Sequence, residues 1–225
     1  MVKSGESGYG IILASGRGRR FGGLKQFALV RGQPLIYYSL QVFEHCAAID
    51  GYVVVTNPSK IRQVRKLVTV LRLRKVIDVV CGGRERMDSV ILGLAVLPED
   101  GYVAVHDAAR PLITVPMLTL GLKAVRKTGA VAFGVPVTDT IKEVVEGRIV
   151  RTVDRSGLVA IQTPQFFDLE ILRRGYAKGS NQGMLITDDC QAVELLGLSP
   201  AVIINTRPNL KVTYPEDLRL CEALL

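Results

Sequence analysis

Residues 12–27 read ILASGRGRRFGGLKQF, a stretch that decides both the fold class and the place of the functional site. It overlaps the short apolar run YGIILA (9–14), which has the length and composition of a buried strand. Four glycines and four cationic side chains then share a loop that contains no acidic residue. In an open α/β sheet, the loop after the first strand is a usual place for phosphate groups. The stretch therefore predicts an α/β fold with an anion site behind its first strand.

The composition of this loop favours a triphosphate as the anion. Gly16 and Gly18 allow the backbone to bend closely around phosphate oxygens. The positive charge comes from Arg17, Arg19, Arg20 and Lys25. The loop is not a P-loop, because GxxxxGK[ST] is absent, and Phe21 stands where a dinucleotide fingerprint needs its third glycine. The alternative is a solvated surface loop. The glycine pair directly after a strand argues against that alternative.

Short β-branched runs alternate along the chain with amphipathic stretches. The predicted strands cover residues 9–14, 51–56, 76–81, 102–107, 130–135, 158–163 and 201–205. The predicted helices cover residues 33–45, 58–73, 84–97 and 115–129, and a last one starts with Pro215. This alternation predicts a three-layer, Rossmann-like α/β fold with a mostly parallel, twisted sheet. With 225 residues, of which 48% are apolar, we expect one domain over residues 1–225.

Residues 139–153 interrupt this alternation. Two short strand-like runs flank Glu146-Gly147 with no helix between them, which is a hairpin signal. We therefore expect a β-hairpin arm, within residues 136–157, that protrudes from the main sheet.

Composition argues against several partners and compartments. The formal net charge of +8 suits an anionic partner, but with no Trp, 6% aromatic residues and no basic run, we expect no nucleic-acid binding. No apolar run at the N-terminus is long enough for a signal peptide or a membrane span, so we expect a cytoplasmic protein with no membrane partner. The cysteines lie far apart without CxxC pairing, which favours reduced thiols at Cys46, Cys81, Cys190 and Cys221.

A second polar segment, CGGRERMDSV (81–90), follows a predicted strand and opens a helix. We expect Gly82 and Gly83 to expose their backbone N–H groups, and Ser89 to offer a hydroxyl. Taken alone, this pattern is as typical of a helix cap as of a loop that binds a nucleobase.

A third segment, VHDAARP (105–111), ends another predicted strand. Asp107 lies where a carboxylate can hold Mg²⁺, and Arg110 where a guanidinium can orient its neighbours. We assign His106 to structure instead of general-base catalysis. A phosphate monoester, with a second pKa of about 6, is already largely ionised at neutral pH and needs no base.

These motifs together resemble those of the 2-C-methyl-D-erythritol 4-phosphate cytidylyltransferases, a nucleotidyltransferase family of the non-mevalonate route to isoprenoids. The first loop resembles the family's A-x-G-x-G-x-R…K-Q signature, residues 82–90 resemble G-G-x-x-R-x-x-S-V, and HDAARP is a specific match. Further similarity lies in PVTDTIK (136–142), TVDRSGL (152–158), IQTPQFF (161–167), LITDD (185–189) and NLKVTYPEDL (209–218). The resemblance runs from about Gly10 to the C-terminus, and Ser15 departs from the usual second alanine of the first loop.

The resemblance implies Mg²⁺-dependent transfer of CMP from CTP to 2-C-methyl-D-erythritol 4-phosphate, giving 4-diphosphocytidyl-2-C-methyl-D-erythritol and pyrophosphate. The implied catalytic residues are Arg20, Lys25, Asp107, Arg110 and Lys211, with Asp107 as the metal ligand. The implied nucleotide-binding residues are Ala14, Ser15, Gly16, Gly18, Gly82, Gly83, Arg86 and Ser89. The residues implied to bind the polyol phosphate are Thr140, Arg155, Thr163 and Thr187.

The resemblance also implies a homodimer formed through the arm, in which Thr140 and Arg155 reach the site of the partner subunit. Within LITDD, Asp188 or Asp189 would hold either the metal or Lys211. Phosphoryl transfer of this kind needs much charge stabilisation and little proton movement, which fits a site rich in Arg and Lys and poor in His.

Two other functions stay open. A ribitol 5-phosphate cytidylyltransferase shares the first loop and the K-Q-F element. Relatives of that type diverge at the serine helix, the R-S-G stretch and Thr-Asp-Asp, where this chain keeps the methylerythritol pattern. A catalytically silent CTP-binding protein of the same fold would bind CTP without turnover. The presence of Lys25, Asp107 and Lys211 argues against it.

Overall fold

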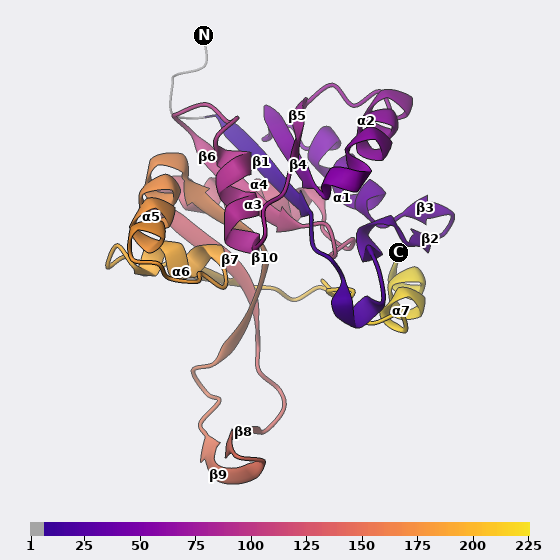
Figure 1. Cartoon of the computed structure of the whole chain (residues 1–225). Helices are drawn as coiled ribbons and strands as arrows, with labels where there is room; N and C mark the ends of the chain where they lie inside the picture. The colour runs from indigo at the N-terminus through magenta and orange to yellow at the C-terminus, as the bar shows by residue number, and fades with distance from the viewer. Residues whose placement is uncertain (1–6) are drawn as a thin grey trace.

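The computed structural model describes residues 7–225, and its centre is one twisted seven-stranded sheet (Figure 1). In spatial order the strands are β11 (Ala201–Ile204), β7 (Ala130–Pro136), β10 (Val159–Asp168), β6 (Tyr102–Asp107), β1 (Gly8–Ala14), β4 (Gly51–Thr56) and β5 (Val76–Cys81). Neighbouring strands pair in parallel, except that β10 runs antiparallel to both β6 and β7. The predicted mostly parallel sheet is thus confirmed.

Helices cover both faces of the sheet and complete the three predicted layers. One face carries α1 (Ile36–His45), α2 (Ile61–Val70) and α4 (Val115–Thr128); the other carries α3 (Arg86–Leu94), α5 (Leu169–Asn181) and α6 (Asp189–Glu194). Each strand serves both layers because successive side chains point to opposite faces. In β1, Ile12 packs into the first core, whereas Ile11 and Leu13 pack into the second.

A third, smaller apolar cluster holds the C-terminal helix. There α7 (Asp217–Leu224) packs beside the short hairpin of β2 (Leu29–Val30) and β3 (Gln33–Pro34). The predicted helix 33–45 begins only at Ile36, because Gln33 and Pro34 pair with β2 instead. Among the helices of residues 7–225, none combines the length and the apolar character that crossing a membrane requires.

β10 is longer than the predicted strand 158–163 and continues to Asp168. Phe166 and Phe167 extend it, since they are fully buried in the first and the second core respectively. A register shift against β7 between Gln162 and Gln165 accommodates the intervening proline, which cannot donate to the ladder.

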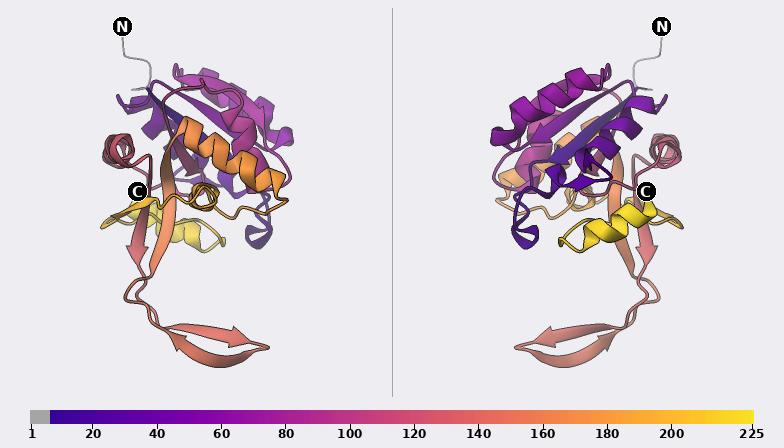
Figure 2. Two further views of the ribbon diagram at one scale, coloured as in Figure 1. Left: turned by 90° about the vertical axis from the view of Figure 1, so that its left-hand side faces the viewer. Right: turned by 90° about the vertical axis from the view of Figure 1, so that its right-hand side faces the viewer.

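The predicted arm is a hairpin of β8 (Ile141–Val145) and β9 (Arg148–Val153) that stands away from the sheet (Figure 2). Its tip residues Glu146 and Gly147 have φ values of 48° and 76°, as a type I′ turn requires. The arm leaves β7 and returns into β10, which explains why β10 is antiparallel. The exposed apolar side chains of the arm are Val144, Val145, Ile149 and Val150.

The contact of α4 with β10 depends on a glycine. A Cβ on Gly121 would lie 2.1 Å from Cε2 of the buried Phe166 ring. We expect Gly121→Ala to lower the free energy of unfolding by about 1–3 kcal/mol, because overpacking displaces the ring. Chemical denaturation will measure this loss. Gly157→Ala is the matched control, since no atom lies within 4 Å of its added Cβ; equal unfolding midpoints for both variants would contradict the prediction.

Candidate active site

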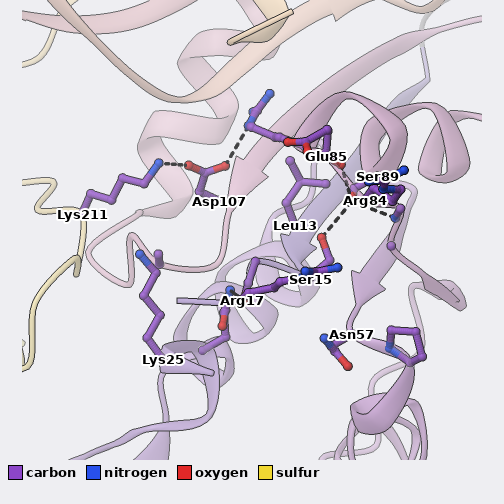
Figure 3. A pocket seen from close by; sticks show the side chains of 17 residues that line it. Leu13, Ser15, Arg17, Lys25, Asn57, Arg84, Glu85, Ser89, Asp107 and Lys211 are labelled. Carbon is purple, nitrogen blue, oxygen red and sulfur yellow. Dashed lines mark hydrogen bonds and ion pairs between the residues drawn. The ribbon is translucent and has the colours of Figure 1, made fainter. Parts of the chain in front are cut away.

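The carboxyl ends of β6, β1, β4 and β5 meet at one edge of the sheet and open into a pocket of about 480 Å³ (Figure 3). A concave site of this size is typical of small-molecule binding, and its place agrees with the sequence prediction. The predicted residues that line it are Ser15, Gly16, Lys25, Gly82, Gly83, Arg86, Ser89, Asp107 and Lys211. Segments from both ends of the chain therefore share one site.

The first loop turns back on itself in two short 3-10 helices, η1 (Arg19–Phe21) and η2 (Lys25–Phe27). Gly18 permits this turn because its φ is 60°, and a Cβ there would lie 1.9 Å from the carbonyl oxygen of Gly23. The turn brings Lys25 back to the pocket, although it lies ten positions after Ser15 in the chain.

The ammonium group of Lys25 is held by the C-terminal segment, where its Nζ donates to the carbonyl oxygen of Val212 at 2.6 Å. Burial, followed by the nearby cation of Lys211, lowers the pKa of Lys25. Gln26 is buried, and its Nε2 donates to the carbonyl oxygen of Gly16 at 3.1 Å, which ties the loop to its own start. Two lysines thus face one pocket and supply charge that suits a triphosphate (Figure 3).

The loop after β5 closes the opposite end of the pocket. Ser89 is buried; its Oγ lies 2.9 Å from the Oγ of Ser15 and accepts from the N–H of Gly83 at 3.2 Å. A Cβ on Gly82 would lie 2.2 Å from the Cβ of Ser15, so glycine lets the two loops meet. The prediction of exposed N–H groups is wrong for both glycines. Gly82 donates to the carbonyl oxygen of Thr56 at 2.8 Å, and Gly83 donates to Ser89. These glycines therefore let neighbouring segments approach closely instead of offering free N–H groups.

Asp107 ends β6 with its carboxylate between two cations. Oδ2 accepts from the Nζ of Lys211 at 2.6 Å and Oδ1 from the Nε of Arg86 at 3.3 Å. Burial alone would raise the pKa of Asp107, but Arg86 and Lys211 outweigh it and hold the pKa well below its usual value. Asp107 therefore stays ionised at neutral pH.

Arg86 is shared between two carboxylates. Its Nη1 and Nη2 donate to Oδ1 and Oδ2 of Asp189 at 3.0 and 2.6 Å, and Asp189 also accepts from the hydroxyl of Tyr176. Burial opposes the charge of Arg86, but Asp189 and then Asp107 raise its pKa well above the ordinary value. Of the two acids in LITDD, Asp188 caps α6, since its Oδ1 accepts from the N–H of the residue three positions on.

A buried hydrogen-bond network holds the backbone of Asp107 in place. The N–H of Asp107 donates to Oγ1 of Thr163 at 3.0 Å, and Oγ1 lies 3.3 Å from Nδ1 of His106. Burial lowers the pKa of His106 to about 3, so the ring is neutral and its Nε2 donates to the carbonyl oxygen of Arg110 at 3.2 Å. Arg110 in turn donates to the carbonyl oxygen of Asn209 at 2.7 Å, which anchors the segment that carries Lys211.

The neutral His106 predicts a pH-dependent stability. Its pKa is about 3 in the folded chain against 6.5 for an ordinary histidine, so the unfolded chain binds the proton first. The free energy of unfolding therefore falls as the pH drops from 6.5 toward 3, by at most about 1.4 kcal/mol per pH unit. In His106→Gln, denaturation curves between pH 4.5 and 6.5 should lose this slope. His45→Gln, at an exposed histidine, should keep it.

The other predicted residues do not line the pocket; they are Ala14, Gly18, Arg20, Arg110, Thr140, Arg155, Thr163 and Thr187. Arg20 is exposed on η1, and its guanidinium carbon lies 5.8 Å from the ring centroid of Tyr214. Thr187 is exposed just before α6. Thr140 and Arg155 are exposed at the base of the arm, where Arg155 donates to the carbonyl oxygen of Thr138.

Sequence reasoning missed the wall that follows β4. Asn57, labelled in Figure 3, and the following Pro58 line the pocket at the end of that strand. The Oδ1 of Asn57 accepts from the N–H of Ser59 at 3.0 Å. Both residues directly follow a parallel strand, and this position was the signal from which they could have been predicted to line the pocket. Arg17, Arg84 and Glu85 also line the pocket.

Comparison with known proteins agrees with this geometry. Residues 9–225 match the family model described as IspD: 2-C-methyl-D-erythritol 4-phosphate cytidylyltransferase. The chain is 42% identical over 218 residues to the 2-C-methyl-D-erythritol 4-phosphate cytidylyltransferase of Caldicellulosiruptor bescii, which covers 96% of each chain. It is 40% identical over 217 residues to that of Halalkalibacterium halodurans, covering 96% of this chain and 95% of the relative.

Solved structures show the same likeness in three dimensions. A crystal structure of 4-diphosphocytidyl-2C-methyl-D-erythritol synthase matches with a TM-score of 0.81 at 31% identity, covering 97% of this chain and 99% of that one. The 4-diphosphocytidyl-2C-methyl-D-erythritol synthase of Anaerococcus prevotii matches with a TM-score of 0.85 at 26% identity, covering 97% of each. The chain belongs to the 2-C-methyl-D-erythritol 4-phosphate cytidylyltransferase family.

Proposed function

We propose that this chain transfers CMP from CTP to 2-C-methyl-D-erythritol 4-phosphate and releases pyrophosphate. The observation that carries this proposal is the pocket itself, where Lys25 and Lys211 lie together with the ionised carboxylate of Asp107, in a chain that matches this family. A phosphate oxygen of the acceptor would attack the α-phosphorus of CTP in line, which needs positioning and charge stabilisation more than a base.

Different residues along the pocket would bind different parts of CTP. Lys25, Lys211 and Arg17 would bear on the triphosphate, where the charge of the transition state develops. The part of the pocket lined by Gly82, Gly83 and Ser89 would take the cytosine ring. Arg20 would have to leave the ring of Tyr214, over which its guanidinium lies, to reach the triphosphate.

The residues present fit a nucleotide-borne Mg²⁺. Asp107 lines the pocket and is ionised, but residues 7–225 hold no group of three His, Cys, Asp or Glu side chains that could cage a metal. Mg²⁺ commonly takes one or two carboxylates and fills its other positions with substrate phosphates and water. When bound there, the ion would neutralise charge on the triphosphate and polarise a phosphoryl oxygen.

The acceptor phosphate would be bound by the arm of a second subunit. Thr140 and Arg155 do not line the pocket of their own chain, and the exposed apolar residues of the arm would be covered in a homodimer. The guanidinium of Arg155 can donate two parallel hydrogen bonds to a phosphate. From the same chain, Thr187 would add a hydroxyl, whereas Thr163 supports Asp107.

We also infer a cytoplasmic location for the enzyme. The four cysteines in the described chain are free thiols, as is typical of a reducing compartment.

Pyrophosphate release tests the function directly. The assay contains Mg²⁺ with CTP, offers either 2-C-methyl-D-erythritol 4-phosphate or ribitol 5-phosphate, and is repeated with UTP. We expect turnover only with CTP and the methylerythritol phosphate. Turnover with ribitol phosphate alone would transfer the acceptor assignment to that polyol, and no turnover with any pair would indicate a silent CTP-binding protein.

A further inference from the structure

The carboxylate of Asp189 is fully buried at the start of α6, and it bonds a residue that lines the pocket. It accepts both terminal nitrogens of Arg86 and the hydroxyl of Tyr176. Its backbone is fixed as well, because its N–H donates to Oε1 of Gln165 at 3.1 Å. Asp189 does not line the pocket, so it can act on a bound nucleotide only through Arg86.

The way in which Asp189 holds Arg86 decides how Arg86 meets Asp107. A guanidinium prefers to pair with a carboxylate through two parallel hydrogen bonds. Here that two-bond pairing is made with Asp189, and Asp107 receives a single bond from Nε at 3.3 Å. The other oxygen of Asp107 is bound to Lys211 at 2.6 Å.

The four groups form a balanced set of two carboxylates and two cations, in which Asp189 competes with Asp107 for one guanidinium. Without that competition, Arg86 would be free to make the two-bond pairing with Asp107. Oδ1 of Asp107 now accepts one long bond of 3.3 Å, and it would then belong to a stronger two-bond pairing. A divalent ion would have to displace that charge-assisted pairing, which is stronger than a neutral hydrogen bond.

We propose that Asp189, supported by Tyr176, is a positioning residue that holds Arg86 away from a two-bond pairing with Asp107. Oδ1 of Asp107 then carries only one long hydrogen bond and can bind the divalent cation of the CTP complex. This inference rests on the metal-binding role assigned to Asp107 in the proposed function. Outer-shell groups that orient a metal ligand typically change metal affinity by about 10- to 100-fold when mutated.

The test measures Mn²⁺ binding by electron paramagnetic resonance, with CTP present and the acceptor absent, so that no turnover occurs. We expect Asp189→Asn to weaken Mn²⁺ binding at least about tenfold. The double variant Arg86→Ala/Asp189→Asn should bind Mn²⁺ more tightly than Asp189→Asn alone, because no guanidinium is left to pair with Asp107. A purely structural role of Asp189 predicts a double variant that is at least as weak as the single one.

Asp188→Asn is the matched control, because it removes the same charge at the neighbouring position. The side chain of Asp188 caps α6 and accepts a hydrogen bond from Gln165. An equal loss of Mn²⁺ affinity in Asp188→Asn and Asp189→Asn would overturn the proposal in favour of a general charge effect. Tyr176→Phe keeps every charge and should weaken Mn²⁺ binding by a smaller factor. It provides the test if thermal melting shows that Asp189→Asn does not fold.

Asp107→Asn separates this inference from the function on which it rests. If Asp107→Asn binds Mn²⁺ as wild type does, the assigned metal site is wrong and the inference fails with it. If Asp107→Asn loses Mn²⁺ while Asp189→Asn binds it as wild type does, the metal site stands and only the positioning role is overturned.

Discussion

Replacing Lys25 by alanine will lower kcat by a factor of about 10²–10³, with an equal loss in kcat/KM. Lys25 lines the pocket, and its ammonium group donates to the carbonyl oxygen of Val212 and is close enough to the cation of Lys211 to interact with it. A positive charge held in this way is preorganised, because it need not reorient when charge develops on the phosphoryl oxygens. Steady-state pyrophosphate release, with both substrates saturating, will measure the loss.

The control for Lys25→Ala is Lys178→Ala, an exposed lysine near the end of α5 that does not line the pocket. It removes the same charge and should leave turnover unchanged. Melting temperatures of both variants will show whether the loss of the contact with Val212 unfolds the first loop. Nearly unchanged kcat in a folded Lys25→Ala variant would remove this residue from the catalytic set.

The second large effect concerns the arm. Arg155→Ala will lower kcat/KM for the methylerythritol phosphate by about 10- to 100-fold, the value of hydrogen bonds to a charged group. Because Arg155 would serve the partner's pocket, the loss can be complemented between subunits. A dimer of one Lys25→Ala chain and one Arg155→Ala chain has one pocket that lacks both residues and one that keeps both.

Co-expression of the two variants with different tags will isolate that mixed dimer. We expect about half of the wild-type activity per dimer, because one of the two pockets is intact, although each parent variant is impaired. A mixed dimer as impaired as its parents would show that Arg155 acts within its own chain. A light-scattering mass equal to one chain would contradict the dimer itself.

The sequence predicted where the pocket lies because one physical rule covers most of its lining. Loops that follow parallel strands meet at one edge of the sheet, and three such loops carried recognisable polar motifs. The same rule applied to Asn57 after β4, but no motif drew attention to it. The direction of β10 could not be read from its residues, since an alternation of apolar side chains carries no direction.

Long-range partners were the least predictable part. The pairing of Arg86 with Asp189 joins residues 103 positions apart, and it depends on how α3 and α6 pack against the sheet.

Helix α5 was not predicted from the sequence, although Asp168 caps it, because Gly175 and Gly179 lower its helix propensity. Packing requires Gly175, since a Cβ there would lie 2.4 Å from the carbonyl oxygen of Ala192.

In the proposed function, the order of the strands in the sheet would determine which part of the substrates each loop contacts. Thr163 lies on β10, Asp107 ends β6, the lysine loop follows β1, and Gly82 follows β5 two strands further on. Neighbouring strands lie about 4.8 Å apart, so in the proposed function the substrates would lie across the sheet with the acceptor near β10, the phosphates near β6 and β1, and the base near β5. Altered nucleobase preference should therefore arise from substitutions beyond β4 and β5, and altered acceptor preference from substitutions near β10 and the arm.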